Sequence, residues 1–221
     1  MEKDNPSADS VKASLSTARI IFWDFDGVIK DSNNIKSDAF YRLFAGFGNT
    51  LASRIRAHHE VNTGQSRYEK IPIYLGWCDI EPDENLVAQY ARRFAELVCD
   101  GVIESDWVPG VVDYIRANRH TKKMFLLTAT PHTEIKYILQ RLGIEECFAA
   151  VFGYPTDKRD GMKSVLINQG CPPGYAVMVG DSIDDFRAAE AIDVPFILRS
   201  TSENAEQFKA FKGCRFTSLT T

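Results

Sequence analysis

The sequence contains no long hydrophobic run. No stretch of its 221 residues approaches the roughly 18–20 consecutive apolar residues that a membrane-spanning helix needs. The first 18 residues also lack the apolar segment of a signal peptide. We therefore expect a cytoplasmic protein that does not associate with a membrane.

Paired cysteines are missing as well. The five cysteines are an odd number, and no two of them form a Cys-x-x-Cys pair. This pattern argues against a disulfide framework and against a structural zinc site, and it is typical of reduced thiols. The residues are Cys78, Cys99, Cys147, Cys171 and Cys214.

Positive charge is not in excess. The chain has 26 Lys and Arg against 30 Asp and Glu, a net charge of −4, which gives no electrostatic basis for binding nucleic acid or an anionic membrane. The 44% hydrophobic and 25% charged residues are typical of a globular protein and exclude a disordered one. A small phosphorylated metabolite remains a possible partner, because local charge decides its binding. Monomer and homodimer both stay open.

Five short apolar runs predict buried strands. Apolar residues without alternation indicate strands that are covered on both faces, as in a parallel sheet. Helical patterns such as Glu134 to Leu142, which ends at Gly143, separate these runs. The alternation predicts an α/β fold with a mostly parallel sheet. The runs are Arg19 to Trp23, Met124 to Ala129, Ala149 to Phe152, Ala176 to Val179 and Pro195 to Leu198.

One long interval breaks this alternation. Residues 32–105 show helical stripes and no convincing strand. Ser66 and Glu69 form a Ser-x-x-Glu capping-box signature, and Pro72 should kink that helix or end it early. An insert directly after the first strand would lie over the carboxyl end of the sheet, where ligands bind. We expect a flexible arm of residues 1–18, a core of residues 19–31 and 106–221, and a helical cap of residues 32–105.

Acidic residues follow the first and the fourth predicted strands. Asp24 and Asp26 are two residues apart in an extended segment, so both carboxylates point to the same side. Asp181, Asp184 and Asp185 follow the fourth strand. Parallel strands bring both groups to one edge of the sheet, where the carboxylates need a cation or a proton. Ligation by oxygen without sulfur favours Mg²⁺.

Polar and basic residues follow the other two strands. Thr128 ends the second strand just before a helix, where a hydroxyl and free backbone N–H groups favour an anion. Lys158, Arg159 and Lys163 come after the third strand and can add positive charge. Together these elements predict a phosphate site with an acidic nucleophile, a metal ion, a hydroxyl and amide cradle, and a lysine.

These motifs resemble those of the haloacid dehalogenase-like hydrolase superfamily, of the phosphoglycolate phosphatase and β-phosphoglucomutase type. The resemblance rests on IIFWDFDGVIKDS, VPGVVDYIRAN, FLLTAT and MVGDSIDDFRAAEA, and it covers residues 19–31 and about 106–200. The insert is similar to the cap of that family in position and length, and much less in sequence. The resemblance implies a Rossmann-like parallel-sheet core with an all-helical cap inserted after the first strand.

The resemblance also implies roles for individual residues. Asp24 would be the nucleophile that forms an aspartyl-phosphate, and Asp26 the general acid and then the general base. Thr128 and the amide of Ala129 would bind the phosphoryl oxygens. Mg²⁺ would be held by Asp24, by the backbone carbonyl of Asp26, and by Asp181.

Supporting roles follow from the same resemblance. Asp185 would support the metal site, and Ser182 stands where the motif commonly has Ser or Thr. The lysine motif is the loosest, and Lys158 fits it best because it follows the third strand. Lys163 lies within the next helix and is the second choice. Either lysine could hold the anionic nucleophile and the phosphoryl group together.

We predict a Mg²⁺-dependent phosphatase for a small phosphomonoester of the phosphoglycolate or sugar-phosphate type. Dehalogenases usually lack an aspartate at the place of Asp26. Mutases of the β-phosphoglucomutase type usually have His where Lys36 stands, which counts against a mutase. The segment from Gly64 to Arg67 nevertheless resembles the mutase cap, in which an Arg grips a second phosphate. Arg67 could equally begin a capped helix on a solvated face.

Non-enzymatic alternatives use similar residues. Receiver modules in signalling combine an acidic Mg²⁺ pocket, a Thr and a Lys, but they are about half this length and lack the helical insert. A binding-only member of the hydrolase superfamily is the other alternative. No core motif residue of this chain lacks a candidate, which favours the enzyme.

Overall fold

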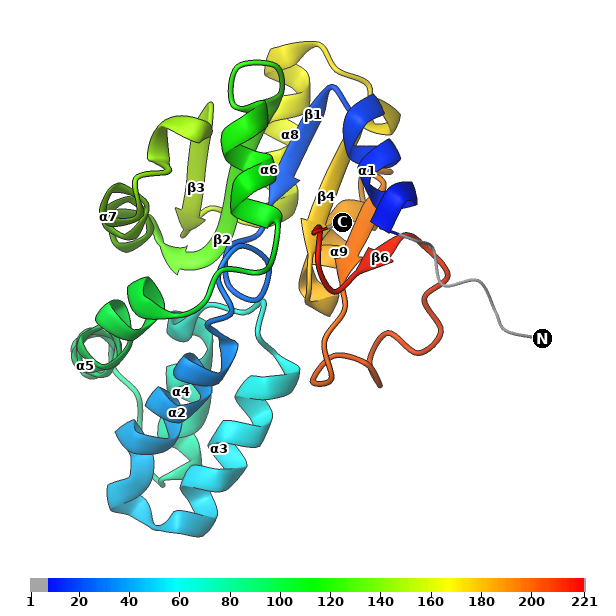
Figure 1. Cartoon of the computed structure of the whole chain (residues 1–221). Coiled ribbons are helices and arrows are strands. Elements are labelled where there is room, and N and C mark those ends of the chain that lie inside the picture. Colours follow the sequence, from blue (N-terminus) through cyan, green and yellow to red (C-terminus); the bar gives the residue numbers. More distant parts are fainter. Residues whose placement is uncertain (1–7, 221) are drawn as a thin grey trace.

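A six-stranded parallel sheet forms the core of the protein. The computed structural model describes residues 8–220, and its strands lie in the order β3-β2-β1-β4-β5-β6 (Figure 1). The expected α/β fold with a parallel sheet is confirmed, and the short strand β6 is an addition to the five expected ones. The strands are β1 (Ile20–Trp23), β2 (Lys123–Pro131), β3 (Ala150–Tyr154), β4 (Ala176–Gly180), β5 (Phe196–Arg199) and β6 (Arg215–Phe216).

Helices cover both faces of the sheet and bury alternate residues of each strand. Ile21 and Trp23 of β1 lie in the hydrophobic cluster that includes α1, α6 and α7, whereas Ile20 and Phe22 lie in the cluster that includes α8 and α9. This burial explains the continuous apolar run of β1. The helices are α1 (Ala8–Thr17), α6 (Val111–Asn118), α7 (His132–Leu142), α8 (Lys158–Gln169) and α9 (Ile183–Glu190), with short 3₁₀ turns at Glu145–Cys147 and Pro173–Tyr175.

Four helices between β1 and α6 form the cap. They lie beyond the ends at which the strand arrows point, so the cap faces the carboxyl edge of the sheet (Figure 1). Phe40, Phe44, Tyr74 and Phe94 are buried and pack against one another as the aromatic core of the cap. No helix within residues 8–220 combines the length and the apolarity that crossing a membrane requires. The cap helices are α2 (Asn33–Phe44), α3 (Asn49–Val61), α4 (Arg67–Trp77) and α5 (Glu84–Glu104), with a 3₁₀ turn at Ala45–Phe47.

Helix α4 begins at the expected capping box. The Ser66 hydroxyl accepts a hydrogen bond from the Tyr68 amide at 3.3 Å, and the Ser66 amide donates to the Glu69 carboxylate at 2.9 Å. Of the two predicted effects of Pro72, a kink or an early end, the early end is wrong, because α4 continues to Trp77. The buried side chains of Ile71 and Leu75 flank the proline, and their packing offsets the one missing backbone hydrogen bond.

The amino-terminal segment differs from its prediction. The flexible arm predicted for residues 1–18 is wrong for residues 8–17, which form α1 beside β6; residues 1–7 lie outside the described part of the chain. Val11 and Leu15 are one helical turn apart and fully buried. Two apolar side chains at this spacing are enough to dock a helix on an existing sheet, even in a stretch rich in Ser and Ala.

Lys30 ties the two chain segments that connect cap and core. Its buried ammonium donates to the carbonyl of Ile103 at 3.1 Å and to that of Ser105, and it lies 4.3 Å from the ring centre of Trp107. These carbonyls belong to the end of α5, whose last turn has no intrahelical donors for them. The hinge of the cap is therefore fixed a few residues from the Asp24-x-Asp26 motif.

The docking of α1 can be tested by shortening Leu15. Leu15→Ala should lower the free energy of unfolding by about 2–4 kcal/mol, because it opens a cavity between α1 and the sheet. The exposed Ser16→Ala on the same helix is the matched control, with an expected change within about 0.5 kcal/mol. Urea unfolding followed by circular dichroism measures both, and an equally small effect of Leu15→Ala would contradict a docked helix.

Candidate active site

Asp24 lies at the carboxyl end of the central strand β1, beneath the cap. Its side chain is buried, and its amide donates to the Val179 carbonyl of β4 at 2.9 Å, which continues the sheet ladder to this residue. The Lys158 ammonium lies 2.9 Å from Asp24 Oδ1. The nucleophile candidate is therefore rigidly held and paired with a cation.

Asp24, Asp181 and Asp185 form an acidic cluster. All three are buried, and one carboxylate oxygen of each lies within 4.8 Å of the others. Gly27 makes room for this cluster, since its φ is +74° and a Cβ there would lie 2.1 Å from Asp181 Oδ2. Asn33, at the start of α2, donates to the same Asp181 oxygen at 2.7 Å. The motif glycine is thus required by both backbone conformation and space.

The cluster fits a hard divalent cation. Burial and the Asp185 carboxylate raise the pKa of Asp24 to about 7, and burial and the charges of Asp24 and Asp185 raise the pKa of Asp181 well above its ordinary value. A cation among these oxygens would remove that repulsion. The donor set contains oxygen only, which suits Mg²⁺ better than zinc or copper.

Lys158 is the lysine that reaches the site. It is the first residue of α8, whose N-cap Asp157 accepts a hydrogen bond from the Asp160 amide. Its ammonium lies between Asp24 and Asp185, 2.5 Å from Asp185 Oδ1. Burial alone would lower the pKa of Lys158, but the two carboxylates raise it, so the side chain is an ammonium. Lys163 is exposed on the same helix, outside the pockets that Asp24 and Thr128 line.

Asp185 is held by a second capping box, at the start of α9. The Ser182 hydroxyl donates to Asp185 Oδ2 at 2.6 Å, and the Asp185 amide donates back to that hydroxyl at 3.2 Å. Gly180 allows this approach, because a Cβ there would lie 2.5 Å from the Asp185 side chain. Ser182 therefore orients Asp185, which in turn holds Lys158.

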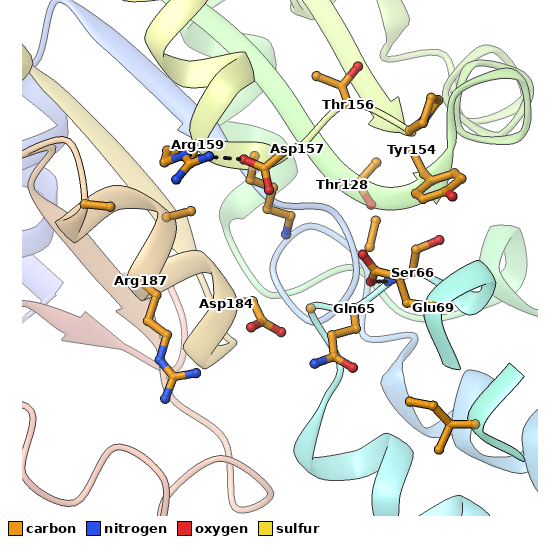
Figure 2. Close-up of a pocket in the computed structure, with 17 residues that line it drawn as sticks. Gln65, Ser66, Glu69, Thr128, Tyr154, Thr156, Asp157, Arg159, Asp184 and Arg187 are labelled. Carbon is orange, nitrogen blue, oxygen red and sulfur yellow. Dashed lines mark hydrogen bonds and ion pairs between the residues drawn. The ribbon is translucent and has the colours of Figure 1, made fainter. Parts of the chain in front are cut away.

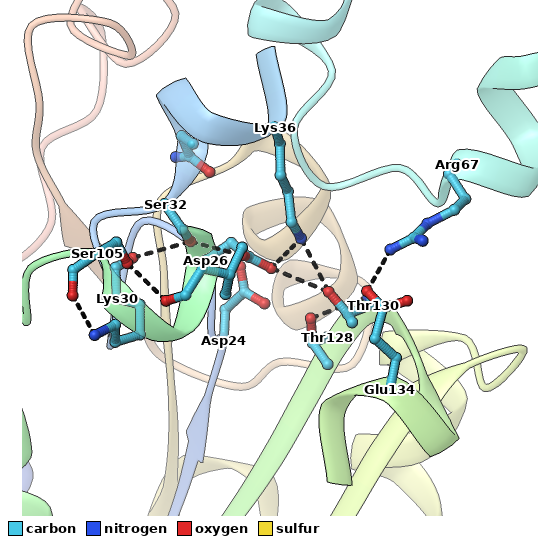
Figure 3. Close-up of polar contacts among 12 residues, drawn as sticks. Asp24, Asp26, Lys30, Ser32, Lys36, Arg67, Ser105, Thr128, Thr130 and Glu134 are labelled. Carbon is cyan, nitrogen blue, oxygen red and sulfur yellow. Dashed lines mark hydrogen bonds and ion pairs between the residues drawn. The ribbon is translucent and has the colours of Figure 1, made fainter. Parts of the chain in front are cut away.

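Asp26 lies in a separate polar network (Figure 3). Its carboxylate accepts hydrogen bonds from the Ser32 hydroxyl at 2.6 Å and the Thr130 hydroxyl at 3.1 Å, and it forms an ion pair with Lys36. Burial opposes the charge of Asp26, but Lys36, with these two hydroxyls, lowers its pKa below the ordinary value. Asp26 is a carboxylate in this arrangement.

Lys36, Asn33 and Thr130 were not assigned a role by the sequence analysis. Lys36 also donates to the Thr130 hydroxyl at 2.9 Å, so a cap helix contacts Asp26 and Thr130 of the core directly. Asn33 and Lys36 are one helical turn apart at the start of the insert, and a helical stripe of polar residues facing the core was the available signal. Thr130 is two residues after Thr128 in the same strand, so the two side chains are expected on the same face, and this spacing was the available signal.

Thr128 and Ala129 line the space above Asp24. Thr128 is buried at the end of β2, and its hydroxyl accepts a hydrogen bond from the Thr130 amide at 3.1 Å. Both residues border two adjoining pockets between the cap and the core, which also share Gln65 and Lys158. The phosphate cradle expected at these two residues stays a prediction.

The outer pocket is an open cleft of about 650 Å³ (Figure 2). Gln65, Ser66 and Glu69 of the cap face Asp184, Arg187 and Tyr154 of the core across it. The inner pocket has a volume of only about 20 Å³. The cleft is wide enough to admit a small ligand, whereas the inner pocket needs a displacement of the cap. The inner pocket is lined by Asp24, Asp26, Lys36, Phe40, His59, Thr63, Gln65, Arg67, Lys70, Phe94, Thr128, Ala129, Thr130 and Lys158.

Arg67 is a buried contact between cap and core. Its guanidinium donates to Glu134 of α7 at 2.5 Å and to the Ala91 carbonyl at 3.3 Å, and it lies 4.6 Å from the ring centre of Phe94 (Figure 3). The reading of Arg67 as a residue on a solvated face is therefore wrong, because the inner pocket and Glu134 enclose its side chain.

Two further contacts hold the cap on the core. Tyr68 of α4 stacks on Tyr154 at the end of β3, with ring centres 5.0 Å apart. Gly64 lies so close to the loop after β4 that a Cβ there would be 2.6 Å from the Ser182 hydroxyl and 2.7 Å from Asp184 Cβ. The structure thus has the cap closed over the acidic cluster.

Several solved structures share this fold over most of the chain. CbbY from Rhodobacter sphaeroides in complex with xylulose-1,5-bisphosphate is 19% identical, with a TM-score of 0.72 over 91% of this chain and 95% of that one. β-Phosphoglucomutase from Clostridium difficile is 17% identical, with a TM-score of 0.72 over 91% and 92% of the chains. A predicted phosphoglycolate phosphatase from Haemophilus somnus is 16% identical, with a TM-score of 0.70 over 92% and 95%.

Sequence comparison identifies the family. No curated protein matches the chain. The family model described as haloacid dehalogenase-like hydrolase matches residues 20–198, from the start of β1 to β5, and so includes the cap and all the carboxylates of the acidic cluster. On this match, the chain is an enzyme that belongs to the haloacid dehalogenase-like hydrolase family.

Proposed function

We propose that the protein is a Mg²⁺-dependent phosphatase that hydrolyses a small phosphomonoester through an aspartyl-phosphate on Asp24. The observation that carries the proposal is the pairing of a buried Asp24 with Lys158 at 2.9 Å, within an acidic cluster and below Thr128. A carboxylate beside a fixed ammonium and a metal site is suited to attack phosphorus, because the anionic phosphoryl group must approach an anionic nucleophile.

The first displacement would use residues from the ends of β1, β2 and β4 and from the start of α8. An Asp24 carboxylate oxygen forms the bond to phosphorus as the bond to the leaving oxygen breaks. Lys158, the Thr128 hydroxyl and the Ala129 amide would stabilise the charge on the phosphoryl oxygens. Asp24, Asp181 and the backbone carbonyl of Asp26 would hold Mg²⁺. When bound, the ion neutralises negative charge in the site.

Asp26 would move the protons. In the second displacement, the Asp26 carboxylate accepts a proton from the water that attacks phosphorus and releases Asp24. In the first displacement, Asp26 must hold a proton to give to the leaving oxygen, and Lys36 and Thr130 are the proton donors in contact with it. Lys36 thus favours the base form of Asp26 and is positioned to assist the leaving group.

The mutase alternative rests on Arg67. Arg67 lines the inner pocket opposite Asp24, as an arginine that binds a second phosphate would. In this structure the Arg67 guanidinium forms an ion pair with Glu134. Lys36, which stands where mutases usually have His, forms an ion pair with Asp26. We therefore favour hydrolysis. Phosphoglycolate and sugar phosphates are the substrates we propose to test first.

Replacing the nucleophile tests the proposal. Asp24→Asn should lower the rate of phosphate release at least ~10³-fold, since an amide cannot form the phosphoryl ester. Release of inorganic phosphate in Mg²⁺ buffer measures this over a panel of phosphoglycolate, pentose, hexose and heptose phosphates, and nucleotides. Isomerised sugar phosphate without phosphate release would indicate the mutase. If the variant hydrolysed the substrate as fast as the wild type, Asp24 could not be the nucleophile.

A lysine comparison tests the charge pairing. Lys158→Ala should lower kcat by about 10²–10³-fold, because it removes the cation between the nucleophile and the phosphoryl group. Lys163 lies exposed on the same helix, so Lys163→Ala is the matched control, and its kcat should be unchanged. Thermal unfolding of both variants shows whether they are folded. Equal and mild losses in the two variants would mean that neither lysine serves the reaction.

Stability should depend on pH and on metal. Because the pKa of Asp24 is raised to about 7, ionisation of this residue lowers the free energy of unfolding. This destabilisation is absent below pH 4, where the carboxyl is protonated in both states, and it is complete above pH 7. In EDTA, Asp24→Asn should therefore be more stable than the wild type by about 1–3 kcal/mol at pH 8 and equally stable near pH 4.

The same carboxylates give a metal prediction. Mg²⁺ should raise the melting temperature of the wild type more at pH 8 than at pH 5, because binding requires ionised Asp24 and Asp181. Differential scanning fluorimetry with and without EDTA measures both effects. A Mg²⁺ shift that is the same in Asp24→Asn and the wild type, at both pH values, would place the metal elsewhere.

A further inference from the structure

Lys70 and His59 form a buried basic pair in the cap. They are 1% and 2% exposed, respectively. The Lys70 ammonium lies 2.8 Å from His59 Nδ1 and donates to the Asn62 carbonyl at 3.0 Å. Both side chains line the inner pocket, of which Asp24 and Thr128 form another part. The reaction proposed above uses neither residue.

Lys70 differs from the other cations of the inner pocket. Each of those has a carboxylate partner, whereas within residues 8–220 no ion pair neutralises Lys70, whose two acceptors are uncharged. A buried ammonium without a counter-charge is costly, and burial lowers the pKa of Lys70 to about 7. The paired cations are Lys36 with Asp26, Arg67 with Glu134, and Lys158 with Asp24 and Asp185.

His59 supplies an independent sign of a missing ligand. Burial and the charge of Lys70 lower the pKa of His59 well below its ordinary value, so the imidazole is neutral. Because Nδ1 accepts the hydrogen bond from Lys70, the ring proton is on Nε2. That Nε2 is buried and has no hydrogen-bond partner in the described part of the chain. The pair therefore offers an N–H donor and an ammonium, and lacks an anionic acceptor.

We propose that the leaving group of the substrate carries a second anionic group, a carboxylate or a phosphate, which binds Lys70 and His59 while the phosphoryl group lies at Asp24. The inference rests on the phosphatase function proposed above. Asp24, His59 and Lys70 line the same inner pocket, so a ligand that enters when the cap is displaced can place its phosphoryl group at Asp24 and its second anion at Lys70. An anion there would compensate the charge of Lys70 and accept the proton of His59.

If Lys70 served only to stabilise the fold, its replacement would lower the melting temperature. We expect no such loss. Methionine has a similar length, would pack on Phe40, and carries no charge to desolvate. Lys70→Met should therefore change the melting temperature little, because removal of the buried charge offsets the loss of the hydrogen bonds to His59 and Asn62. A residue that does not contribute to folding and yet faces the catalytic pocket serves the ligand.

Matched substrate pairs test the inference. 2-Phosphoglycolate is compared with 2-hydroxyethyl phosphate, 3-phosphoglycerate with glycerol 3-phosphate, and glucose 1,6-bisphosphate with glucose 1-phosphate. In the wild type, kcat/KM should be about 10–100-fold higher for the anionic member of at least one pair. The pair that responds distinguishes a carboxylate from a phosphate.

Lys70→Met should abolish this preference and leave kcat/KM for the neutral members within about 3-fold of the wild type, since only the second anion contacts Lys70. Arg56→Met, on α3, removes an exposed cap cation and is the charge-matched control that should keep the preference. Equal losses on both members of each pair in Lys70→Met, or no preference in the wild type, would overturn the anion subsite.

Binding separates this inference from the proposed function. Calorimetry measures the affinity of Asp24→Asn for the same six compounds, with and without Lys70→Met. If no compound is hydrolysed but the anionic members bind more tightly in a Lys70-dependent way, the phosphatase fails and the subsite stands. If both members are hydrolysed and bound alike, the phosphatase stands and the subsite fails. If there is neither turnover nor preferential binding, both are overturned.

Discussion

Repulsion among buried carboxylates is the constraint on which the site depends. The end of β1 and the junction of β4 with α9 bring Asp24, Asp181 and Asp185 within 4.8 Å of one another, and all three side chains are buried. The fold tolerates this because Lys158 lies between Asp24 and Asp185, and Asn33 donates a hydrogen bond to Asp181. One lysine cannot neutralise three carboxylates, so negative charge in the cluster remains uncompensated. The same repulsion would favour the binding of a divalent cation among these oxygens.

The cap completes the site with charges of the opposite sign. Lys36, Arg67 and Lys70 all come from cap helices and line the inner pocket, whereas the acidic residues come from the core. Lys36 and Arg67 are satisfied by core carboxylates when the cap is closed, so they also serve as contacts between the two parts. Lys70 is not satisfied in this way. The difference separates residues that close the cap from a residue that selects what is bound beneath it.

Much of the core could be predicted from local sequence. The apolar run before Asp24 is continuous because β1 is covered on both faces, and that signal needs no tertiary information. The Ser66–Glu69 capping box is likewise local, and it forms as expected. Pro72 and α1 show where local rules fail, because packing of Ile71 and Leu75, and of Val11 and Leu15, outweighs weak or unfavourable propensity.

The sequence by itself determined the strand-end motifs, the position of the insert and the acidic and basic residues available to the chemistry, because each depends on spacing along one segment. Only the tertiary structure decided which lysine reaches Asp24. Lys158 and Lys163 are five residues apart on one helix, and the direction of α8 against the sheet points the first at Asp24 and leaves the second exposed. It also decided that Arg67 is buried, that Lys36 contacts Asp26, and that Lys70 forms no ion pair with any residue of the described chain. These are contacts between segments 10 to 94 residues apart, and a side chain's electrostatic environment is set by such neighbours, which local sequence does not contain.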